Sequence, residues 1–502
     1  MIHIKKITLV VIATTLSASI FAQNEVDALR FSRNFNLGTA RSAAMGGAFT
    51  ALGGDASSLA SNPAGIGVYR SSDLTITGNL MQAGVNSSYM GNSYDDSRTR
   101  FGLSNLGIIG TYNLYNDDGL VNLNFGFTHD KLANFNERYE YVGSSIDANT
   151  GTYLDYFTSI VKDDVAKGFV DLSLEGYMAV ELGLTNYIND DTIYSNLDGA
   201  SRTKNGKKSV TSGNIGEYGF NFGGNVSNIF YFGVRVGLQS VSFSQTTLDE
   251  EWNEKRDTAG LNEFYYKRDY RVDGIGVNFK VGFIVWPFIK SDIPLAGLRI
   301  GAAIHTPTYL SIDDKYELYA DSKLFGDNLT YFYEYVEDLE YNLETPLKIL
   351  AGAAYVFGHQ DSDWRGILSL DYEYLDYSKI KTRKDGERVG QNLKMDSYFN
   401  SASNFRLGGE LGYRNVSFRA GYGLYGNPYK DIPENEGRDG KVNVYSGGIG
   451  VQVSEMFNLA FAYQRVTQKD KGYLYNNDIV KSNPVNYEIA QNNFFITFGW
   501  RF

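Results

Sequence analysis

The sequence predicts an all-β fold: a 14-stranded antiparallel transmembrane β-barrel with an N-terminal plug, or hatch, in its lumen. Three observations lead to this prediction. Segments of roughly 10–20 residues alternate apolar side chains with small or polar ones, as the strands of membrane barrels do. Short and long connections between these segments take turns along the chain. The chain also has 38 Tyr and 54 Gly but only 8 Pro, a composition that suits long, closely packed strands with interfacial aromatic side chains.

The first residues have the pattern of an export signal. Two basic residues, Lys5 and Lys6, precede an apolar run from Ile7 to Ile20, and Ala22 is a suitable residue before a cleavage point. We therefore expect residues 1–22 to be a cleaved signal peptide. A membrane anchor is the alternative, but the run is shorter than the ~20 residues that a spanning helix needs.

Overall composition excludes several classes of protein. There is no Cys, which rules out a lipoprotein, disulfides, thiolate metal sites and cysteine nucleophiles. The 58 acidic residues outnumber the 46 basic ones, and loss of the two leader lysines changes the net charge from −12 to −14. Nucleic acid is not an expected partner, because phosphate binding needs clustered Lys and Arg. The mean hydropathy of −0.29 is compatible with a barrel, in which only alternate residues face lipid.

Fourteen segments are predicted to be strands. Most of them follow the rule of alternation; in the third, for example, Val121, Leu123 and Phe125 alternate with Asn122 and Asn124. The last strand has one apolar face that ends in Trp500 and Phe502, like the C-terminal strand by which outer-membrane barrels are recognised during assembly. The predicted strands are 72–84, 100–116, 119–131, 213–227, 230–248, 264–286, 296–315, 340–357, 364–379, 403–414, 416–427, 441–453, 456–470 and 488–502.

The connections between these strands indicate how the barrel is oriented. Five are short (116–118, 227–229, 358–363, 414–415 and 454–455), and seven are long and polar (85–99, 132–212, 249–263, 316–339, 380–402, 428–440 and 471–487). Membrane barrels have short periplasmic turns and long extracellular loops. We therefore expect residues 72–502 to form an outer-membrane barrel with a long extracellular loop at 132–212. A soluble sandwich or propeller, the alternative, would show no such asymmetry.

Residues 23–71 do not alternate and are predicted to form the plug. Small residues and the glycine pairs at 46–47 and 53–54 prevent any long helix. Asp55 is a suitable cap for one short helix, and Asn62 followed by Pro63 should end it in a turn. A segment this apolar and rich in glycine is more stable inside the barrel lumen than in water. The glycine pairs are not phosphate loops, because no Gly-Lys-Ser or Gly-Lys-Thr follows them.

At this segment the sequence resembles the FadL/TodX family of outer-membrane transporters for long-chain fatty acids and other hydrophobic compounds, in a form like its Bacteroidota members. The resemblance rests on residues 40–48 (ARSAAMGGA), on residues 62–67 (NPAGIG) and on the strand count. Residues 305–307 and 419–422 resemble the family more weakly. The resemblance implies a monomeric barrel, a hatch that carries the Asn-Pro-Ala motif, and passage of apolar ligands to a lateral opening in the wall.

Ionisable residues inside the predicted strands occupy the alternate positions whose side chains are expected to face the lumen. Facing lipid, an Arg or Lys would cost about 2–4 kcal/mol at the membrane midplane. They either pair with the acidic residues Asp371, Glu373 and Glu410 as structural charges or hold the carboxylate of a ligand. The candidate ligand contacts are Arg235, Lys280, Arg299, Lys348, Arg406 and Arg419.

Enzymatic chemistry is not expected, because no motif indicates a Ser/His/acid arrangement. The four His are His3, His129, His305 and His359. His129 or His305 could serve a haem or a metal, but a surface or hydrogen-bonded His is the favoured interpretation. We therefore expect neither a cofactor nor a metal site.

The functional hypothesis is passive transport of hydrophobic molecules across the bacterial outer membrane, with long-chain fatty acids as the favoured substrate. Outer-membrane lipid would surround a single copy of the chain. The alternatives are an adaptor or binding protein of a secretion system, a receptor for haem or another small molecule, and a porin. The proposed gate is the motif Asn62, Pro63, Ala64 and Gly65, a stiff turn wedged inside the barrel. Its alternative role is simply to end the preceding helix.

Overall fold

The structure is a computed structural model. It describes residues 25–502 except 36, 117, 144–150, 169–171, 190–191, 196–202, 254–259, 292, 326–329, 359–362, 385–386, 389–391 and 476–479. The signal peptide expected at 1–22, together with His3 and His359, lies outside the described residues.

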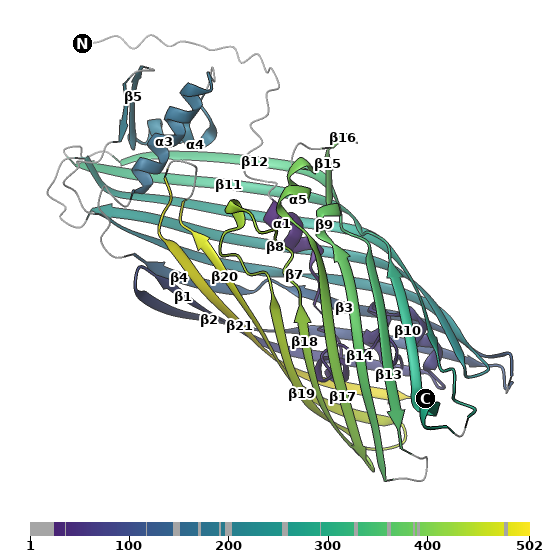
Figure 1. Cartoon of the computed structure of the whole chain (residues 1–502). Helices are drawn as coiled ribbons and strands as arrows, with labels where there is room; N and C mark the ends of the chain where they lie inside the picture. Colours follow the sequence, from purple (N-terminus) through teal and green to yellow (C-terminus); the bar gives the residue numbers. More distant parts are fainter. Residues whose placement is uncertain are drawn as a thin grey trace.

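The wall is one antiparallel sheet that closes on itself (Figure 1). Closure occurs between the first and last strands, where Asp73 pairs with Arg501 and Tyr89 with Val485. With collinear pieces joined, the barrel has 14 strands, as predicted. The pieces are β1 (Asp73–Tyr89), β2 (Asn92–Asn113), β3 (Leu120–Asn134), β4 (Glu137–Val142), β7 (Thr203–Val226), β8 (Phe230–Asn253), β9 (Gly260–Val285), β10 (Leu298–His305), β11 (Tyr309–Phe325), β12 (Thr330–Glu344), β13 (Lys348–Phe357), β14 (Trp364–Asp376), β15 (Lys381–Lys384), β16 (Glu387–Arg388), β17 (Ser401–Tyr413), β18 (Val416–Tyr425), β19 (Val442–Gln452), β20 (Phe457–Tyr473) and β21 (Pro484–Arg501).

Two neighbouring wall strands are interrupted at the same level by a proline. β10 and β11 both pair with β9 and are separated by residues 306–308, while β12 and β13 are separated by residues 345–347. Pro307 and Pro346 have no N–H to donate to the ladder. Thr308 and Thr345 bridge the interruption, since the Thr345 N–H donates to the Thr308 carbonyl at 3.1 Å.

The outward face carries the apolar band that a membrane barrel needs. On β8, for example, Phe230, Val234, Val236 and Leu238 are all exposed. Tyrosines mark the edge of this band towards the long connections, as the aromatic girdle of membrane barrels does. They are Tyr372, Tyr374, Tyr422, Tyr445 and Tyr463.

Several segments predicted as long loops are in fact continuations of the strands. β1 reaches Tyr89 and β2 starts at Asn92, so most of the loop predicted at 85–99 is a hairpin. The loop predicted at 316–339 is likewise largely strand in β11 and β12. The prediction was wrong because beyond the apolar band many outward residues are polar, as Glu317, Glu334 and Asp338 are. The alternation on which it relied is therefore lost there although the ladder continues.

The segment predicted as one loop, 132–212, contains secondary structure of its own. Within it lie β4, the helices α3 (Tyr153–Ala166) and α4 (Leu174–Glu181), the hairpin of β5 (Thr185–Asn189) and β6 (Thr192–Ser195), and the start of β7. α3 and α4 lie at the long-loop end of the barrel (Figure 1) and bury Tyr153, Phe157 and Met178 in its large aromatic cluster. Elsewhere at this end lies α5 (Asn392–Tyr398).

The N-terminal segment packs against the inner face of the wall (Figure 1). It consists of α1 (Glu25–Ser32), α2 (Ala40–Ala44) and two 3₁₀ helices, Ala56–Ala60 and Pro63–Val68. As predicted, Asp55 caps the first 3₁₀ helix, because its side chain accepts a hydrogen bond from the Ser57 N–H. Among the helices of the described part of the chain, none is both long enough and apolar enough to cross a membrane.

Candidate functional site

Glycines on the inner face of the wall let the N-terminal segment approach the strands at backbone distance. A Cβ atom on Gly282 would lie 1.9 Å from the Asn62 Oδ1, and one on Gly233 would lie 2.2 Å from the Pro63 carbonyl oxygen. Gly301 and Gly421 are equally close to the backbone of Thr50 and Gly46. No other residue would fit at these wall positions without displacing the segment.

The Asn62 side chain joins three parts of the chain. Its amide Nδ2 donates to the Thr50 carbonyl at 2.7 Å and to the Phe283 carbonyl of β9 at 3.1 Å. Its Oδ1 accepts from the Ala64 N–H at 3.0 Å and so caps the helix that Pro63 begins. The side chain is 0% exposed. The turn therefore lies against the wall, with Asn62 bonded to the backbone of a strand.

Lys280 and His305 hold the other side of this turn. The Lys280 Nζ donates to the Ala60 carbonyl at 3.1 Å, and the His305 Nε2 lies 2.7 Å from the Ser61 carbonyl oxygen. Side chains of β9 and β10 thus bind the carbonyl groups of Ala60 and Ser61, the two residues before Asn62. We call this set of contacts the clasp.

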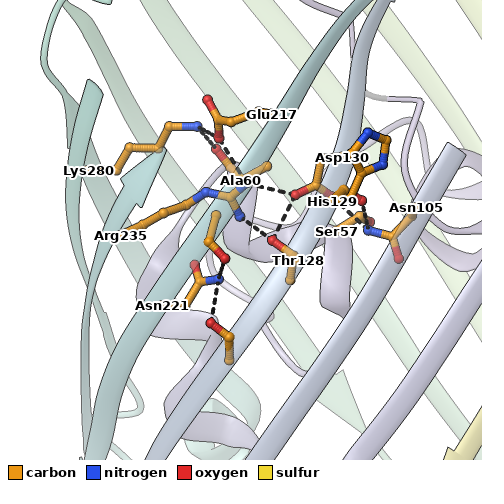
Figure 2. A network of polar contacts seen from close by, with 12 residues as sticks. Ser57, Ala60, Asn105, Thr128, His129, Asp130, Glu217, Asn221, Arg235 and Lys280 are labelled. Atoms are coloured by element: carbon orange, nitrogen blue, oxygen red, sulfur yellow. Dashed lines mark hydrogen bonds and ion pairs between the residues drawn. The ribbon is translucent and has the colours of Figure 1, made fainter. Parts of the chain in front are cut away.

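Glu217 is the centre of a buried network of charges beside the clasp (Figure 2). Its carboxylate lies 2.6 Å from the Lys280 Nζ and 2.8 Å from an Arg235 guanidinium nitrogen. Arg235 also pairs with Asp130 at 2.8 Å and donates to the Thr128 hydroxyl at 2.8 Å. A buried charge is tolerated only when it is paired and hydrogen-bonded in this way.

A second network lies on β14 and β17. Both terminal nitrogens of the Arg406 guanidinium are 3.3 Å from the Glu373 Oε2. Two residues before Glu373 on β14, the Asp371 Oδ2 accepts from both the N–H and the hydroxyl of Thr50. The wall therefore holds the N-terminal segment from this side as well.

The third network joins the N-terminal segment to β17 and β18. The Glu410 carboxylate accepts from Arg41 at 2.9 Å and from Arg419 at 2.5 Å. Because Arg41 lies in α2, this ion pair ties the helix to the wall.

Most of the six basic residues predicted from sequence as ligand contacts are already paired. Arg235, Lys280, Arg406 and Arg419 each have a carboxylate partner. Arg299 donates to the Leu52 carbonyl at 3.1 Å and lies 3.9 Å over the ring of Trp286. Within the described part of the chain, Arg299 and Lys348 make no ion pair within 4 Å, although Lys348 interacts electrostatically with Glu373 at longer range. Sequence reasoning missed Glu217, although it shares the inward parity of Asn221 and Asn225 on its strand.

Several cavities lie along the N-terminal segment, and the linings of the three described first differ. The central cavity, of about 60 Å³, adjoins the clasp and is lined by four basic side chains, Lys131, Lys280, Lys348 and Arg406, against the two carboxylates of Asp130 and Glu373.

The upper cavity, of about 310 Å³, lies nearer the long-loop end. Its lining combines aromatic and aliphatic side chains with polar and charged ones. The first group includes Leu29, Phe35, Phe135, Phe243 and Tyr487, and the second includes Arg30, Arg33, Glu137 and Asp470. Phe35 also lines the central cavity, so the two adjoin. The lower cavity, of about 790 Å³, lies at the short-turn end beside Arg414, Asn415 and Glu455 and is more polar.

Helices α3 and α4 are bound to the wall above these cavities. The Glu251 carboxylate of β8 accepts from the Tyr153 N–H, the first residue of α3, at 2.8 Å. In α4, Glu175 accepts from the hydroxyls of Tyr156 and Tyr266 at 3.1 and 3.2 Å. Burial raises the pKa of the Glu175 carboxyl, and these two hydrogen bonds oppose the shift. Among the described residues no group of His, Asp and Glu side chains could hold a metal ion.

Solved structures with the same architecture cover nearly the whole chain. The toluene transporter TodX of P. putida has 13% sequence identity and a TM-score of 0.54, over 92% of this chain and 98% of its own. A FadL homologue of Pseudomonas aeruginosa has 12% identity and a TM-score of 0.52, over 93% and 99%. The toluene transporter TbuX of Ralstonia pickettii has 14% identity and a TM-score of 0.50, over 92% and 98%.

The chain has the fold of the TodX and FadL channels. This agrees with the family resemblance read from residues 40–48 and 62–67. No family model and no curated protein matches the sequence. The structural neighbours are transporters or channels and not enzymes.

Proposed function

We propose that the protein is a monomeric outer-membrane channel through which hydrophobic molecules, long-chain fatty acids among them, cross passively. Residues 23–71, described from 25 onwards, are its plug. The observation that carries this proposal is the position of the N-terminal segment, which is held to the inner wall by the clasp and has a cavity rich in aromatic side chains on one side and a more polar cavity on the other.

The upper cavity supports an apolar ligand. Its volume of about 310 Å³ is at the lower end of the range of small-molecule sites, and its aromatic lining is of the kind that such sites have. Solved toluene transporters share the fold, which favours an apolar small molecule over a sugar or an ion. A haem, a secretion partner or free water is favoured by no feature of the described residues.

The central cavity supports a ligand with a negative group. Four basic side chains against two acidic ones leave an excess of positive charge in its lining. Of the four, Lys280 and Arg406 are paired with carboxylates, whereas Lys131 and Lys348 make no ion pair within 4 Å with a described residue. Lys348 lies opposite Glu373, with which it interacts electrostatically, and its ammonium group is the one that we propose for the ligand. A carboxylate in this cavity with its chain in the adjoining upper cavity is the arrangement that a fatty acid would adopt.

The motif Asn62, Pro63, Ala64 and Gly65 is the proposed gate. The clasp fixes its position, and Pro63 stiffens it. Opening requires the clasp contacts to break, so the ligand must compensate for them by its own interactions.

Uptake of two labelled compounds tests this function. Strains that lack the gene, carry it, or carry Lys348→Gln are compared for uptake of oleate, which has a carboxylate, and of toluene, which has none. The proposal expects both compounds to enter faster with the gene. Lys348→Gln should raise the concentration of oleate for half-maximal uptake and leave that of toluene unchanged, while Lys441→Gln at an exposed position changes neither. Equal uptake of both compounds with and without the gene would rule the proposal out.

A further inference from the structure

Two strands run from the upper cavity, above the N-terminal segment, to the lower cavity below it. A small cavity of about 50 Å³ shares Phe35, Gln468 and Ile489 with the upper cavity and extends it downwards along β20 and β21. The lower cavity begins on the same two strands at Ala460 and Thr497. The distance from Gln491 to Thr497, six residues, is roughly 20 Å along an extended strand.

Two inward-facing layers separate the cavities. The first consists of Gln464 and Asn493. Asn493 is 0% exposed, yet within the described part of the chain neither its Oδ1 nor its Nδ2 has a hydrogen-bond partner, and the same is true of the Gln464 Oε1. Buried amides rarely lack partners, and each such case needs an explanation. Here the amides are placed to bind water or the polar end of a molecule that passes between the cavities.

The second layer is apolar and consists mainly of small side chains. The wall contributes Ala460, Ala462 and Phe495, and the N-terminal segment contributes Leu37 and three alanines of α2. Only Leu37 and Phe495 have large side chains. Because alanines surround them, a change of rotamer in these two would widen the layer without any movement of the backbone.

On the opposite side, glycines of β7, β8 and β9 let the N-terminal segment pack more closely against the wall. There a Cβ atom on Gly223 would lie 2.6 Å from the Ile66 side chain, and Gly233 and Gly282 contact Pro63 and Asn62 at backbone distance. The clasp also lies on that side. On the side of β20 and β21, α2 contacts the wall mainly through the small side chains of its alanines, and the Ala40 N–H donates to the Thr497 hydroxyl at 2.8 Å.

We infer that the seam between α2 and strands β20 and β21 is the passage by which the transported molecule moves from the upper to the lower cavity, with Leu37 and Phe495 as its constriction. The inference rests on the proposed function and adds a route and a selectivity. A constriction of two side chains among alanines would pass slender apolar molecules, such as an unbranched acyl chain or a single aromatic ring. It would reject fused rings.

Variants that narrow or widen the constriction test the passage. Ala462→Trp narrows it from the wall, and Leu37→Trp narrows it from the segment, where barrel assembly does not depend on the change. Both should reduce uptake of toluene and oleate severalfold. Leu37→Ala should widen it and raise the ratio of naphthalene to toluene uptake severalfold. The matched controls are Phe461→Trp, which faces outward on the same strand, and Leu52→Ala, which lies elsewhere in the segment; both should leave these values unchanged.

The outcomes separate the passage from the proposed function. Uptake in the parent strain that equals uptake without the gene would contradict the proposed function itself. The passage would be contradicted if the parent protein supports uptake but the Leu37 variants behave like it. In that case Leu37→Trp would show normal uptake and Leu37→Ala an unchanged ratio of naphthalene to toluene uptake, and the molecule would take another route. Heat-modifiable migration on gels reports folding for every variant, and the two Leu37 variants decide the question if Ala462→Trp does not assemble.

Discussion

Replacement of Asn62 by Ala should release the turn from the wall while the barrel remains intact. The substitution removes the hydrogen bonds to the Thr50 carbonyl, the Phe283 carbonyl and the Ala64 N–H. All three groups belong to the N-terminal segment or its contact with β9. The ladder between β8 and β9 does not depend on the Asn62 side chain.

The expected size of the effect follows from these three bonds. Each intramolecular hydrogen bond contributes about 0.5–1.5 kcal/mol net, and buried partners that lose it add a penalty. Together they give a loss of about 2–4 kcal/mol in the free energy of opening of the segment, which corresponds to about 30- to 700-fold more of the open form.

Hydrogen exchange at the amides of residues 50–65 measures this opening. In Asn62→Ala these amides should exchange faster by that factor, uptake should change severalfold, and heat-modifiable migration should remain normal. The control is Asn79→Ala, a buried inward Asn whose one bond, to the Phe494 carbonyl at 3.5 Å, stays within the wall. Unchanged exchange in the segment would refute the reasoning, and loss of the folded barrel would show that Asn62 stabilises the wall instead.

Three further predictions concern the wall and the helices above it. Glu217→Gln leaves two buried cations, Arg235 and Lys280, without the carboxylate that they share, which should lower the stability of the barrel by about 3–5 kcal/mol. The transition temperature of the gel shift should therefore fall, and an unchanged temperature would contradict the structural role of this network. Gly282→Val should leave barrel assembly intact but expose the N-terminal segment to protease. The control is Gly409→Val, where a Cβ atom would meet nothing nearer than 3.8 Å and the segment should stay protected. Equal cleavage of the two variants would contradict the close packing of the segment at Gly282. Because burial raises the pKa of Glu175 above 4.5, its stabilisation of α4 is fully present below pH 4.5 and is lost as pH rises through the raised value. The protection factors of the α4 amides, which are exchange rates corrected for the intrinsic effect of pH, should therefore fall as pH rises, and Glu175→Gln should abolish that fall.

Much of the barrel could be predicted from the sequence because lipid imposes a simple rule. Every outward residue inside the membrane must be apolar, so alternation locates the strands and parity locates inward charges such as Arg235 and Glu373. The same rule fails beyond the membrane, where water on the outer face accepts polar residues. That is why the extended hairpins of β1 with β2 and of β11 with β12 were predicted as loops.

The candidate site was harder to predict, since its partners are distant in the sequence. The role of Asn62 as a residue bonded to strand backbone could be foreseen from its turn chemistry, but not its contact with Phe283, 221 residues away. Parity indicated that Lys280 and Arg406 face inward without indicating that carboxylates already neutralise them. The inward wall glycines such as Gly233 and Gly282 were a usable signal, because a strand interior seldom carries glycine unless a backbone approaches it.

A structure with a bromine-labelled fatty acid tests the central claim most directly, because anomalous scattering locates the bromine without bias. The account predicts bromine in the upper cavity near Phe135 and Phe243, with the carboxylate in the central cavity beside Lys348. Bromine found only on the outward apolar band, with both cavities unchanged, would contradict it.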